Sequence, residues 1–412
     1  MKITPTKLIT LVTLVLAATT ALAQADPVPF GLASPKDGDH FEVTKPLLFW
    51  YSSPEAKNYE VFVDDAKIGE APTAPVPIVN YGVQTPLSVG LHHWYVKAIA
   101  TTGNATASSR FSFIIDPFGN WPSWAIGPFV RYGQNPILSP QGAGWESLDS
   151  YNPGVLFDQG KFRMLYRAQG DPKISREGYA ESPDGVTFTR NPNPVIDNSE
   201  DAAMKHDCED ARFFKYQGTY YAFYTADGLC EATSSDGLTW NKLGKVLPAK
   251  NGAMVCDPFG TPVKINDKFA MFYGNNKVFI SYSDDLIHWG KGTLIDMKFP
   301  SGWVGPFEPC VAITDYSSSQ PGNVVLFIAG ALNGKKIWYY AISEALFSKA
   351  DLTTKVAQLD DCIFKPRGER YESGTYKNCL WMNCIIQHNK QWMMYYGAGD
   401  RTIGLATAPV NP

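Results

Sequence analysis

Three stretches of the chain share one pattern: Ser182-Pro183-Asp184-Gly185-Val186-Thr187-Phe188, Ser234-Ser235-Asp236-Gly237-Leu238-Thr239-Trp240 and Ser283-Asp284-Asp285-Leu286-Ile287-His288-Trp289. In each stretch a serine stands two residues before an aspartate, and an aromatic residue ends the segment. Asp-Gly favours a tight hairpin turn, and an aromatic ring at this spacing can pack between neighbouring sheets. We interpret the pattern as a structural turn that recurs once in each repeat of a β-rich architecture.

The repeat extends beyond these three stretches. Runs of apolar and aromatic residues with the composition of β-strands lie at 162–167, 220–224, 269–273, 324–328 and 392–396. The strand that follows each run ends at a small polar residue: Ser182, Ser234, Ser283, Ser343 and Thr407. A spacing of roughly 50 to 64 residues suits four-stranded blades around a central channel. The sequence therefore predicts an all-β protein in which residues 118–412 form a five-bladed β-propeller.

The N-terminal part of the chain has a different character. Residues 1–25 begin with Met1-Lys2, continue with an apolar run and end near Ala21-Leu22-Ala23, which is typical of a secretory signal peptide. Residues 26–117 contain short stretches of alternating apolar residues, typical of a small immunoglobulin- or fibronectin-like β-sandwich. We therefore expect a secreted or periplasmic protein with a sandwich in front of the propeller.

Composition excludes several classes of partner. The net charge of −4 is thinly spread, without a basic stripe, which argues against nucleic acid. No apolar run after residue 25 is long enough to cross a bilayer. The seven cysteines show no C-x-x-C spacing, and the acidic residues show no EF-hand pattern, so we expect no metal and no cofactor. Cysteine pairing and oligomeric state stay open.

Polar and acidic residues stand near the start of each predicted blade, where the strands that line a propeller channel begin. They are Asn152, Glu209, Asp210, Arg212, Asp257, Glu308 and Glu372. Carboxyl groups gathered in one channel raise one another's pKa, so that one can act as an acid and another as a base. Cleavage of a glycosidic bond needs such a pair. The alternative is that Asp210 and Arg212 form only a buried ion pair.

The predicted propeller resembles glycoside hydrolase family 130, the β-mannoside phosphorylases and β-mannosidases. The matching segments, in the family's order, are 152–154 with 166–168, 208–213, 264–289, 370–374 and 395–406. The resemblance implies that Asp210 is the general acid, acting through a hydroxyl of the mannose itself. It also implies that Arg167 and Asp400 hold sugar hydroxyls. Ala211 replaces the proline of the family's Glu-Asp-Pro-Arg motif.

The chain departs from the family's phosphorylases where they bind phosphate through Arg and His. Here the corresponding segments read Tyr273-Gly274 and Ile328-Ala329-Gly330. Without those donors phosphate has little to hold it, so the departure favours hydrolysis. Water then needs a base, and Glu308 is the candidate because the family often has only Gly and Pro there. The alternative is that Glu308 is a structural carboxylate that caps a loop.

We therefore expect a glycosidase that is exo-acting and inverting on β-mannosides or a related glycoside. The predicted catalytic residues are Asp210 and Glu308, and the predicted substrate-binding residues are Asn152, Arg167, Glu209, Arg212, Asp257, Tyr371, Glu372 and Asp400. Three alternatives remain open: a five-bladed glycosidase of the arabinanase, xylosidase or invertase kind, a mannoside phosphorylase, and a non-catalytic sugar-binding propeller.

Overall fold

The computed structural model describes residues 26–41, 44–73, 75–88, 90–115, 122–198, 207–297, 299, 303–317, 320–333, 338–360 and 362–410. The chain divides into two compact units. The first comprises residues up to Asp39, Lys45–Pro86 and His92–Phe113, and the second comprises His40–Thr44, Leu87–Leu91 and Ile114–Pro412. The predicted signal peptide, residues 1–25, lies outside the described residues.

The first unit consists of two sheets. A three-stranded sheet has the order β1-β3-β6, and a six-stranded sheet has the order β2-β9-β7-β4-β5, with β8 paired to β7. The strands are β1 (Leu32–Ser34), β2 (Asp39–Phe41), β3 (Leu47–Tyr51), β4 (Ala56–Val63), β5 (Ala66–Pro72), β6 (Ile78–Gly82), β7 (Gly90–Ala100), β8 (Ala105–Ala107) and β9 (Phe111–Ile115). The sheets meet where Trp50 of β3 packs edge-on against Tyr59 of β4, with ring centroids 5.4 Å apart. Alternate residues of β7 are buried, as expected for a strand with one face toward a core.

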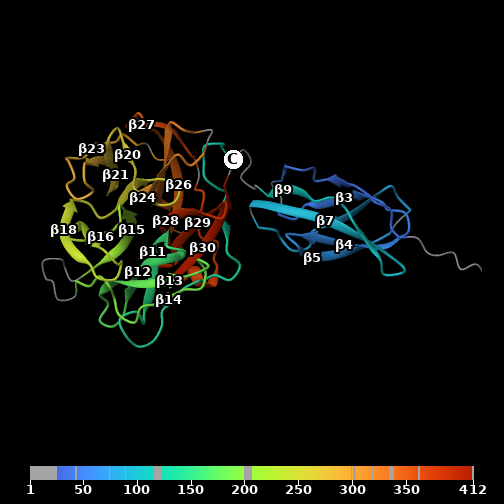
Figure 1. Cartoon of the computed structure of the whole chain (residues 1–412), viewed down its shortest axis with the longest axis horizontal. Coiled ribbons are helices and arrows are strands. Elements are labelled where there is room, and N and C mark those ends of the chain that lie inside the picture. Colours follow the sequence, from blue (N-terminus) through green and yellow to red (C-terminus); the bar gives the residue numbers. More distant parts are fainter. Residues whose placement is uncertain are drawn as a thin grey trace, which may run out of the picture. The chain divides into compact units, whose positions relative to one another are not determined.

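The second unit consists of sheets, antiparallel except for one strand pair, that largely follow one another along the chain (Figure 1). The sheet orders are β11-β12-β13-β14, β15-β16-β17-β18, β23-β22-β21-β19-β24-β25-β26-β27 with β20 paired to β21, and β10-β30-β29-β28. The strands of the first two are β11 (Asp149–Asp158), β12 (Lys161–Gln169), β13 (Ser175–Ser182), β14 (Thr189–Arg190), β15 (Glu209–Tyr216), β16 (Thr219–Ala226), β17 (Gly228–Ser234) and β18 (Asn241–Leu247). The nine-stranded sheet contains β19 (Gly252–Cys256), β20 (Lys264–Ile265), β21 (Lys268–Asn275), β22 (Lys277–Ser283), β23 (Thr293–Leu294), β24 (Trp303–Thr314), β25 (Asn323–Asn333), β26 (Trp338–Ser348) and β27 (Asp351–Gln358). The last sheet contains β28 (Leu380–His388), β29 (Gln391–Ala398), β30 (Thr402–Pro409) and β10 (Val130–Arg131).

The pairing of β10 with β30 joins the start of the second unit to its end. Val130 lies opposite Thr407 and Arg131 lies opposite Ala406, so the last sheet takes its outer strand from the beginning of the unit. The nine-stranded sheet arises because β19 pairs in parallel with β24, at Val255 and Ala312. The all-β prediction is confirmed, since the only helix among the described residues is a three-residue 3-10 turn at Arg370–Glu372.

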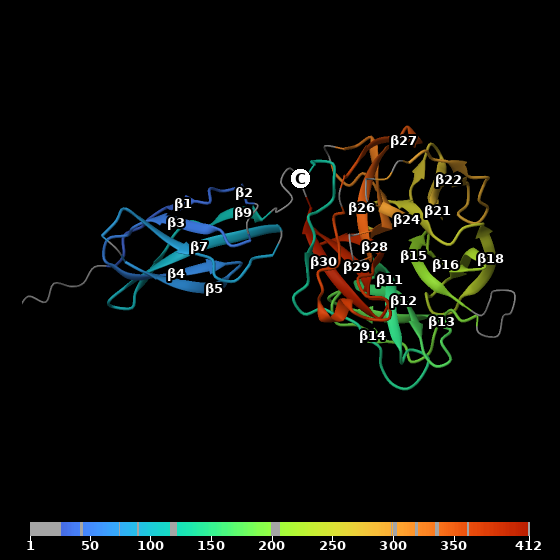
Figure 2. The same cartoon turned by 180° about the vertical axis from the view of Figure 1, so that it is seen from behind.

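Strands β11, β15, β24 and β28 lie in the middle of the second unit (Figure 2). Bulges interrupt the register of β11, β15, β24 and β28, and the residues left without a partner include Asn152, Asp210, Cys310 and Asn383. Asn152 and Asp210 have positive φ values of 47° and 58°, which is rare for residues other than glycine. Bulges of this kind bend a strand locally and redirect a side chain.

The Ser-x-Asp turns quoted at the outset are built from hydrogen bonds of the aspartate. Asp236 Oδ1 accepts from the backbone N of Leu238 and of Thr239, both at 2.8 Å, and Ser234 Oγ donates to the same oxygen at 2.9 Å. These bonds lower the pKa of Asp236 to about 2. Gly237 has φ 78°, but the equivalent Leu286 of the third turn has φ 73°. Leu286 is 1% exposed, so its burial offsets the cost of this conformation.

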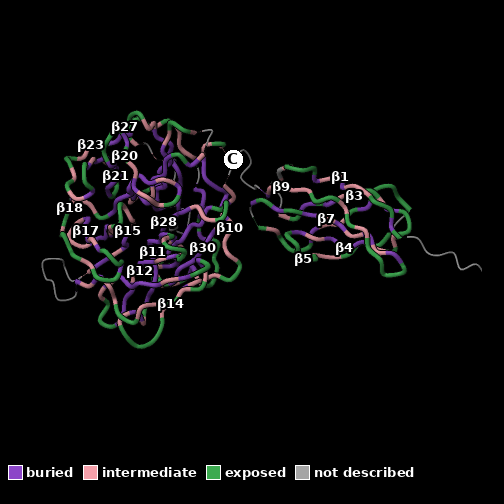
Figure 3. Tube along the Cα trace, viewed as in Figure 1, coloured by how far each residue is buried: buried purple, intermediate pink, exposed green. Residues whose placement is uncertain are grey.

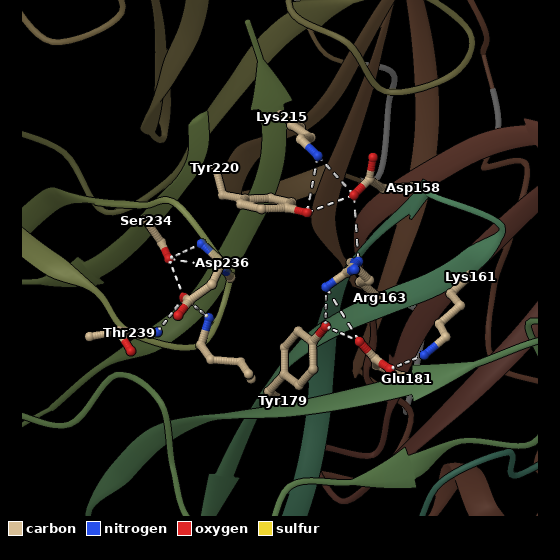
Figure 4. Close-up of polar contacts among 12 residues, drawn as sticks. Asp158, Lys161, Arg163, Tyr179, Glu181, Lys215, Tyr220, Ser234, Asp236 and Thr239 are labelled. Atoms are coloured by element: carbon tan, nitrogen blue, oxygen red, sulfur yellow. Dashed lines mark hydrogen bonds and ion pairs between the residues drawn. The ribbon is translucent and has the colours of Figure 1, made fainter. Parts of the chain in front are cut away.

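A polar network joins the first two sheets of the second unit (Figure 4). Asp158 at the end of β11 accepts from Lys215 Nζ at 2.9 Å and from the Tyr220 hydroxyl at 2.6 Å, both in the next sheet. Arg163 of β12 lies 3.6 Å from the same carboxylate and donates to the Tyr179 hydroxyl at 2.9 Å. Buried residues follow the strands, and exposed residues gather in the loops (Figure 3).

Candidate active site

A cavity of about 270 Å³ opens at the middle of the second unit. Its lining comes from all of the sheets described above for this unit and is mostly polar: Asn152, Arg167, Glu209, Asp210, Thr225, Lys250, Asn251, Asn275, Pro306, Glu308, Tyr340, Tyr376, Cys379, Trp381 and Asp400. A pocket with several convergent polar and titratable groups is the expected form of a small-molecule site.

One side of the cavity is organised around the Arg167 guanidinium of β12. Arg167 donates to Asp210 Oδ1 at 3.2 Å and to Glu209 Oε1 at 2.8 Å, and it lies over the ring of Tyr151. Asn152 Nδ2 also donates to Asp210 Oδ1, at 2.8 Å. Both bonds fall on Oδ1, so no hydrogen bond from a described residue reaches Oδ2 of Asp210. The two bulges thus bring Asn152 and Asp210 together and leave one carboxylate oxygen to face a ligand.

Two further carboxyl groups on this side have altered acidity. Burial raises the pKa of Asp400 to about 6, against the opposing effect of Arg167. Burial also raises the pKa of Glu209. Negative charge on Asp210 adds to both shifts. Three carboxyl groups therefore share one cation, and part of this cluster changes protonation within the range in which enzymes work.

Glu308 of β24 has a different set of partners. Asn251 and Asn275 donate to Oε1 at 2.7 and 2.8 Å, and the Tyr340 hydroxyl donates to Oε2 in a short hydrogen bond. Burial raises the pKa of Glu308, whereas the bond from Tyr340 lowers it. Glu308 is 8% exposed, so this carboxylate is held by neutral donors in a buried part of the cavity.

Arg212 connects the two sides from behind the cavity. Its NH1 donates to the backbone oxygen of Asp210 at 2.9 Å and to Asn251 Oδ1 at 3.0 Å. The side chain is 1% exposed and lies over the ring of Trp381. Asn251 in turn donates to Glu308. One buried guanidinium therefore fixes the position of the Asp210 backbone and, through the Asn251 side chain, the orientation of Glu308. Arg212 does not line the cavity, so it acts as a positioning residue.

Glu177 of β13 lies next to the bulge that carries Asp210 and is fully buried. Its Oε1 accepts from the backbone N of Ala211 at 3.1 Å, and its Oε2 has no hydrogen-bond partner among the residues that the structure describes. Burial, together with the charge of Asp210, raises the pKa of Glu177 well above its ordinary value. The carboxyl group supports the bulge that carries Asp210 through its bond to Ala211 N.

The structure brings together six of the predicted site residues: Asn152, Arg167, Glu209, Asp210, Glu308 and Asp400. Asp257 lies elsewhere and accepts hydrogen bonds from Phe259 N and Thr261 N in its own turn. Glu372 accepts from Arg131 Nε at 2.7 Å and from Arg367 N at 2.8 Å. Tyr371 lines a separate pocket, where its hydroxyl lies 3.0 Å from that of Tyr396.

Sequence reasoning missed the neutral donors and one cation of the cavity. Asn251, Asn275 and Tyr340 hold Glu308, and Lys250 lines the cavity with an exposed side chain. Asn275 and Tyr340 stand at the end of β21 and near the start of β26. Both residues stand at the ends of strands that lead toward the channel, and this position in the sequence could have identified them.

No metal-binding group of three His, Cys, Asp or Glu side chains occurs among the residues that the structure describes. All seven cysteines are described, and each is a free thiol. In the same part of the chain, no helix has the length and apolar character needed to span a bilayer.

Comparison with known proteins decides the family. A family model for glycoside hydrolase family 130, described as β-1,4-mannooligosaccharide phosphorylase, matches residues 132–412. The chain belongs to glycoside hydrolase family 130. Among its relatives, a 1,2-β-oligomannan phosphorylase from Thermoanaerobacter sp. (strain X514) is 28% identical over 304 residues, which cover 67% of this chain and 95% of the relative. The resemblance inferred from the sequence motifs is thereby confirmed.

Solved structures of similar proteins support the same assignment. A putative glycoside hydrolase from Bacteroides ovatus has a TM-score of 0.63 and 27% sequence identity, covering 71% of this chain and all of that one (100%). A second structure has the same TM-score of 0.63 and 27% identity, covering 71% of this chain and 98% of that one. Its description states that this family of mannoside phosphorylases contains glycoside hydrolases that target β-1,2-mannosidic linkages in Candida mannan. The family thus includes both reaction types, and the choice between them depends on the site.

Proposed function

We propose that this protein is a secreted, exo-acting and inverting glycoside hydrolase that removes mannose from β-mannosides. In this proposal Asp210 is the general acid and Glu308 is the general base. The relatives described above are named for activity on β-1,2-linked mannosides, so β-1,2-linked oligomannosides are the first substrates to test. Family membership favours a mannoside over the arabinanase, xylosidase or invertase alternative.

The observation that carries the proposal is the way in which the two carboxylates are held in one cavity. Asp210 has a free oxygen beside a guanidinium that is able to bind sugar hydroxyls. Glu308 is oriented by three donors, none of them charged. Burial raises the pKa of Glu308, and a more basic carboxylate is better suited to remove a proton from water.

The proposed reaction balances with these groups alone. Water attacks the anomeric carbon while Glu308 accepts one of its protons, and the bond from the anomeric carbon to the leaving oxygen breaks. The leaving oxygen takes a proton from a hydroxyl of the mannose, and Asp210 gives its own proton to that hydroxyl. The products are mannose of inverted configuration and the shortened glycan, and both carboxyl groups exchange protons with solvent before the next turnover.

Phosphorolysis is the second candidate, because the relative from Thermoanaerobacter is a phosphorylase by name and Lys250 adds a cation to the cavity. The guanidinium of Arg167 is engaged with Glu209 and Asp210, and that of Arg212 lies outside the lining. One exposed lysine binds phosphate more weakly than the paired Arg and His of the phosphorylases. This difference favours hydrolysis.

The test is to follow cleavage of β-1,2-mannobiose by the purified chain with and without inorganic phosphate. The hydrolase proposal expects free mannose at the same rate in both conditions, first released in the inverted configuration. Strict dependence on phosphate, with mannose 1-phosphate as product, would establish the second candidate. Binding of the disaccharide without either product would identify a non-catalytic sugar-binding protein.

We also propose the finer architecture expected from the sequence. The repeated antiparallel sheets of the second unit are taken as five blades, with β19–β23 and β24–β27 as two blades joined by the parallel pair. The two packed sheets of the first unit are taken as an immunoglobulin-like sandwich over residues 26–117. A secreted or periplasmic location would follow from a signal peptide over residues 1–25, and N-terminal sequencing of the mature protein tests it.

A further inference from the structure

A second and larger cavity, of about 810 Å³, lies beside the candidate active site. Strands β18, β21 and β22 and the turns next to them supply its lining. Two residues, Lys250 and Asn275, line both cavities. They are exposed, whereas Asp210 and Glu308 are buried. The two cavities therefore adjoin at the open side of the active site.

The lining of the second cavity combines cations with aromatic rings. Lys245, Lys250 and Lys291 all contribute to it. The one carboxylate in the lining is Asp227, which lies 3.7 Å from Lys245. Within the described part of the chain, Lys250 and Lys291 form no ion pair, although the charge of Lys250 acts on Glu209. Positive charge in this cavity thus exceeds the negative charge that faces it.

The aromatic side chains in the same cavity are Tyr273, Phe279 and Trp289. Tyr273 and Phe279 stack on each other, with ring centroids 5.4 Å apart. Trp289 is partly buried, and its Nε1 donates to Leu286 O at 2.9 Å. With the polar tip of the indole bonded away, the ring offers an apolar surface of the kind on which the face of a pyranose packs.

We propose that this second cavity binds the leaving-group side of the substrate, and that this part of the glycan carries an anionic group, either a phosphate ester or a carboxylate. The proposal rests on the exo-acting hydrolase proposed above. An enzyme that removes one terminal sugar must hold the rest of the glycan on the leaving-group side, and the second cavity is the space that adjoins the active site. Neutral sugars would pack against the aromatic rings of this cavity. The two lysines without ion-pair partners favour an acidic group on the substrate.

The test compares three disaccharides with the same scissile β-mannosidic bond. The first is neutral, the second carries a phosphate on the reducing-end sugar, and the third has a uronic acid there. The measured quantity is the ratio of kcat/KM for each acidic substrate to that for the neutral one. We expect an acidic substrate to be preferred at low salt and the preference to fall as ionic strength rises. The phosphate and carboxylate arms show which acid the site accepts.

Lysine variants then show which residues cause the preference for acidic substrates. Lys250→Gln and Lys291→Gln should each reduce the ratio by roughly two- to five-fold, as expected for one ion pair near the surface. Lys277→Gln is the matched control, because Lys277 is exposed on β22 but lies outside both cavities. Equal kcat/KM for neutral and acidic substrates, or a preference that survives both variants, would overturn the inference.

Calorimetry with Asp210→Asn separates this inference from the proposed function. If the unaltered protein cleaves no disaccharide, but Asp210→Asn binds an acidic one more tightly than the neutral one and the added change Lys291→Gln removes the difference, the anionic site stands and the hydrolase proposal fails. If all three disaccharides are cleaved equally and bind equally, the hydrolase stands and the anionic site fails.

Discussion

Asp210 and Glu308 line the same cavity, but their surroundings differ in the charge of the donors. Asp210 sits on a strand bulge with positive φ and shares the Arg167 guanidinium with Glu209. Glu308 receives its hydrogen bonds from two amides and a phenol. A guanidinium favours the ionised form of a carboxyl group, whereas burial among neutral donors raises the pKa.

The two carboxyl groups are therefore oriented by different kinds of donor within one cavity. On the Glu308 side, orientation comes without a cation in hydrogen-bond contact, and burial raises the pKa of the carboxyl group. On the Asp210 side, Arg167 and Asn152 both donate to Oδ1, which leaves Oδ2 for a ligand. The experiments that follow distinguish the two residues by how the loss of activity depends on the leaving group and on pH.

The largest expected effect belongs to Asp210→Asn. This change removes the proton donor but keeps an acceptor for Arg167 and Asn152, so kcat on β-1,2-mannobiose should fall by about 10² to 10⁴-fold. The loss should be smaller on a nitrophenyl β-mannoside, because its leaving group needs little protonation. Steady-state kinetics on both substrates checks this.

Asp257→Asn is the matched control, since Asp257 belongs to the same unit but bonds only within its own turn. Its kinetics should equal those of the unaltered protein. An equal loss on both substrates in Asp210→Asn would contradict the role of Asp210 as an acid.

Glu308→Ala should produce a loss that does not depend on the leaving group. Loss of the base should lower kcat by about 10² to 10³-fold on both the disaccharide and the aryl mannoside. Azide needs no base, so adding it should restore turnover on the aryl substrate and yield a mannosyl azide of inverted configuration, detected by mass spectrometry and NMR.

Asp210→Asn serves as the comparison for the azide experiment, because its water-activating group is intact and azide should not increase its rate. A Glu308→Ala variant with full activity and no response to azide would assign Glu308 a structural role.

A third experiment addresses the donors of Glu308 through the pH profile. The Tyr340 hydroxyl lowers the pKa of Glu308, so Tyr340→Phe should raise that pKa further. Because the base must be ionised, activity would then be lost at a higher pH on the acidic side. The deficit there would be roughly ten-fold if the pKa of Glu308 rises by about one. The measurement is kcat/KM against pH.

Asp400, with a pKa raised to about 6, also contributes to the acidic limb, but it has no bond to Tyr340 and its contribution should stay constant. Tyr376→Phe is the control, since Tyr376 lines the cavity and is exposed. An acidic limb that moves equally in both variants, or in neither, would contradict the pairing of Tyr340 with the base.

Most of the charged residues of the site, although not Lys250, could be predicted from the sequence, whereas of its neutral hydrogen-bonding residues only Asn152 was predicted. Asp210, Arg167 and Asp400 stand in motifs that resemble a known family, and the period of the Ser-x-Asp turns located the strands that carry them. Asn251 and Tyr340 stand in no such motif, and only the packing of separate sheets brings them to Glu308.

The residues placed outside the cavity illustrate the same limit. Glu372 also precedes the first strand of its sheet, but Arg131 from the start of the unit reaches it because β10 pairs with β30. Arg212 follows Asp210 by two residues, yet its side chain is buried behind the cavity. Residue spacing located the strand, whereas the local bulge decided which side chain faces the ligand.

The smallest expected effect concerns Glu177 and tests whether a second charge lies beside Asp210. Because its pKa is raised well above the ordinary value, Glu177 should be neutral, and Glu177→Gln keeps an acceptor for Ala211 N without changing the charge. Both kcat and the basic limb of the pH profile should therefore stay the same. Glu177→Ala leaves that buried N–H unpaired and should cost about 1–3 kcal/mol of unfolding free energy, measured by denaturant titration. If Glu177 were ionised, Glu177→Gln would remove a negative charge beside Asp210, and the basic limb of the pH profile would shift. That shift would show that the bulge carries a second charge next to Asp210.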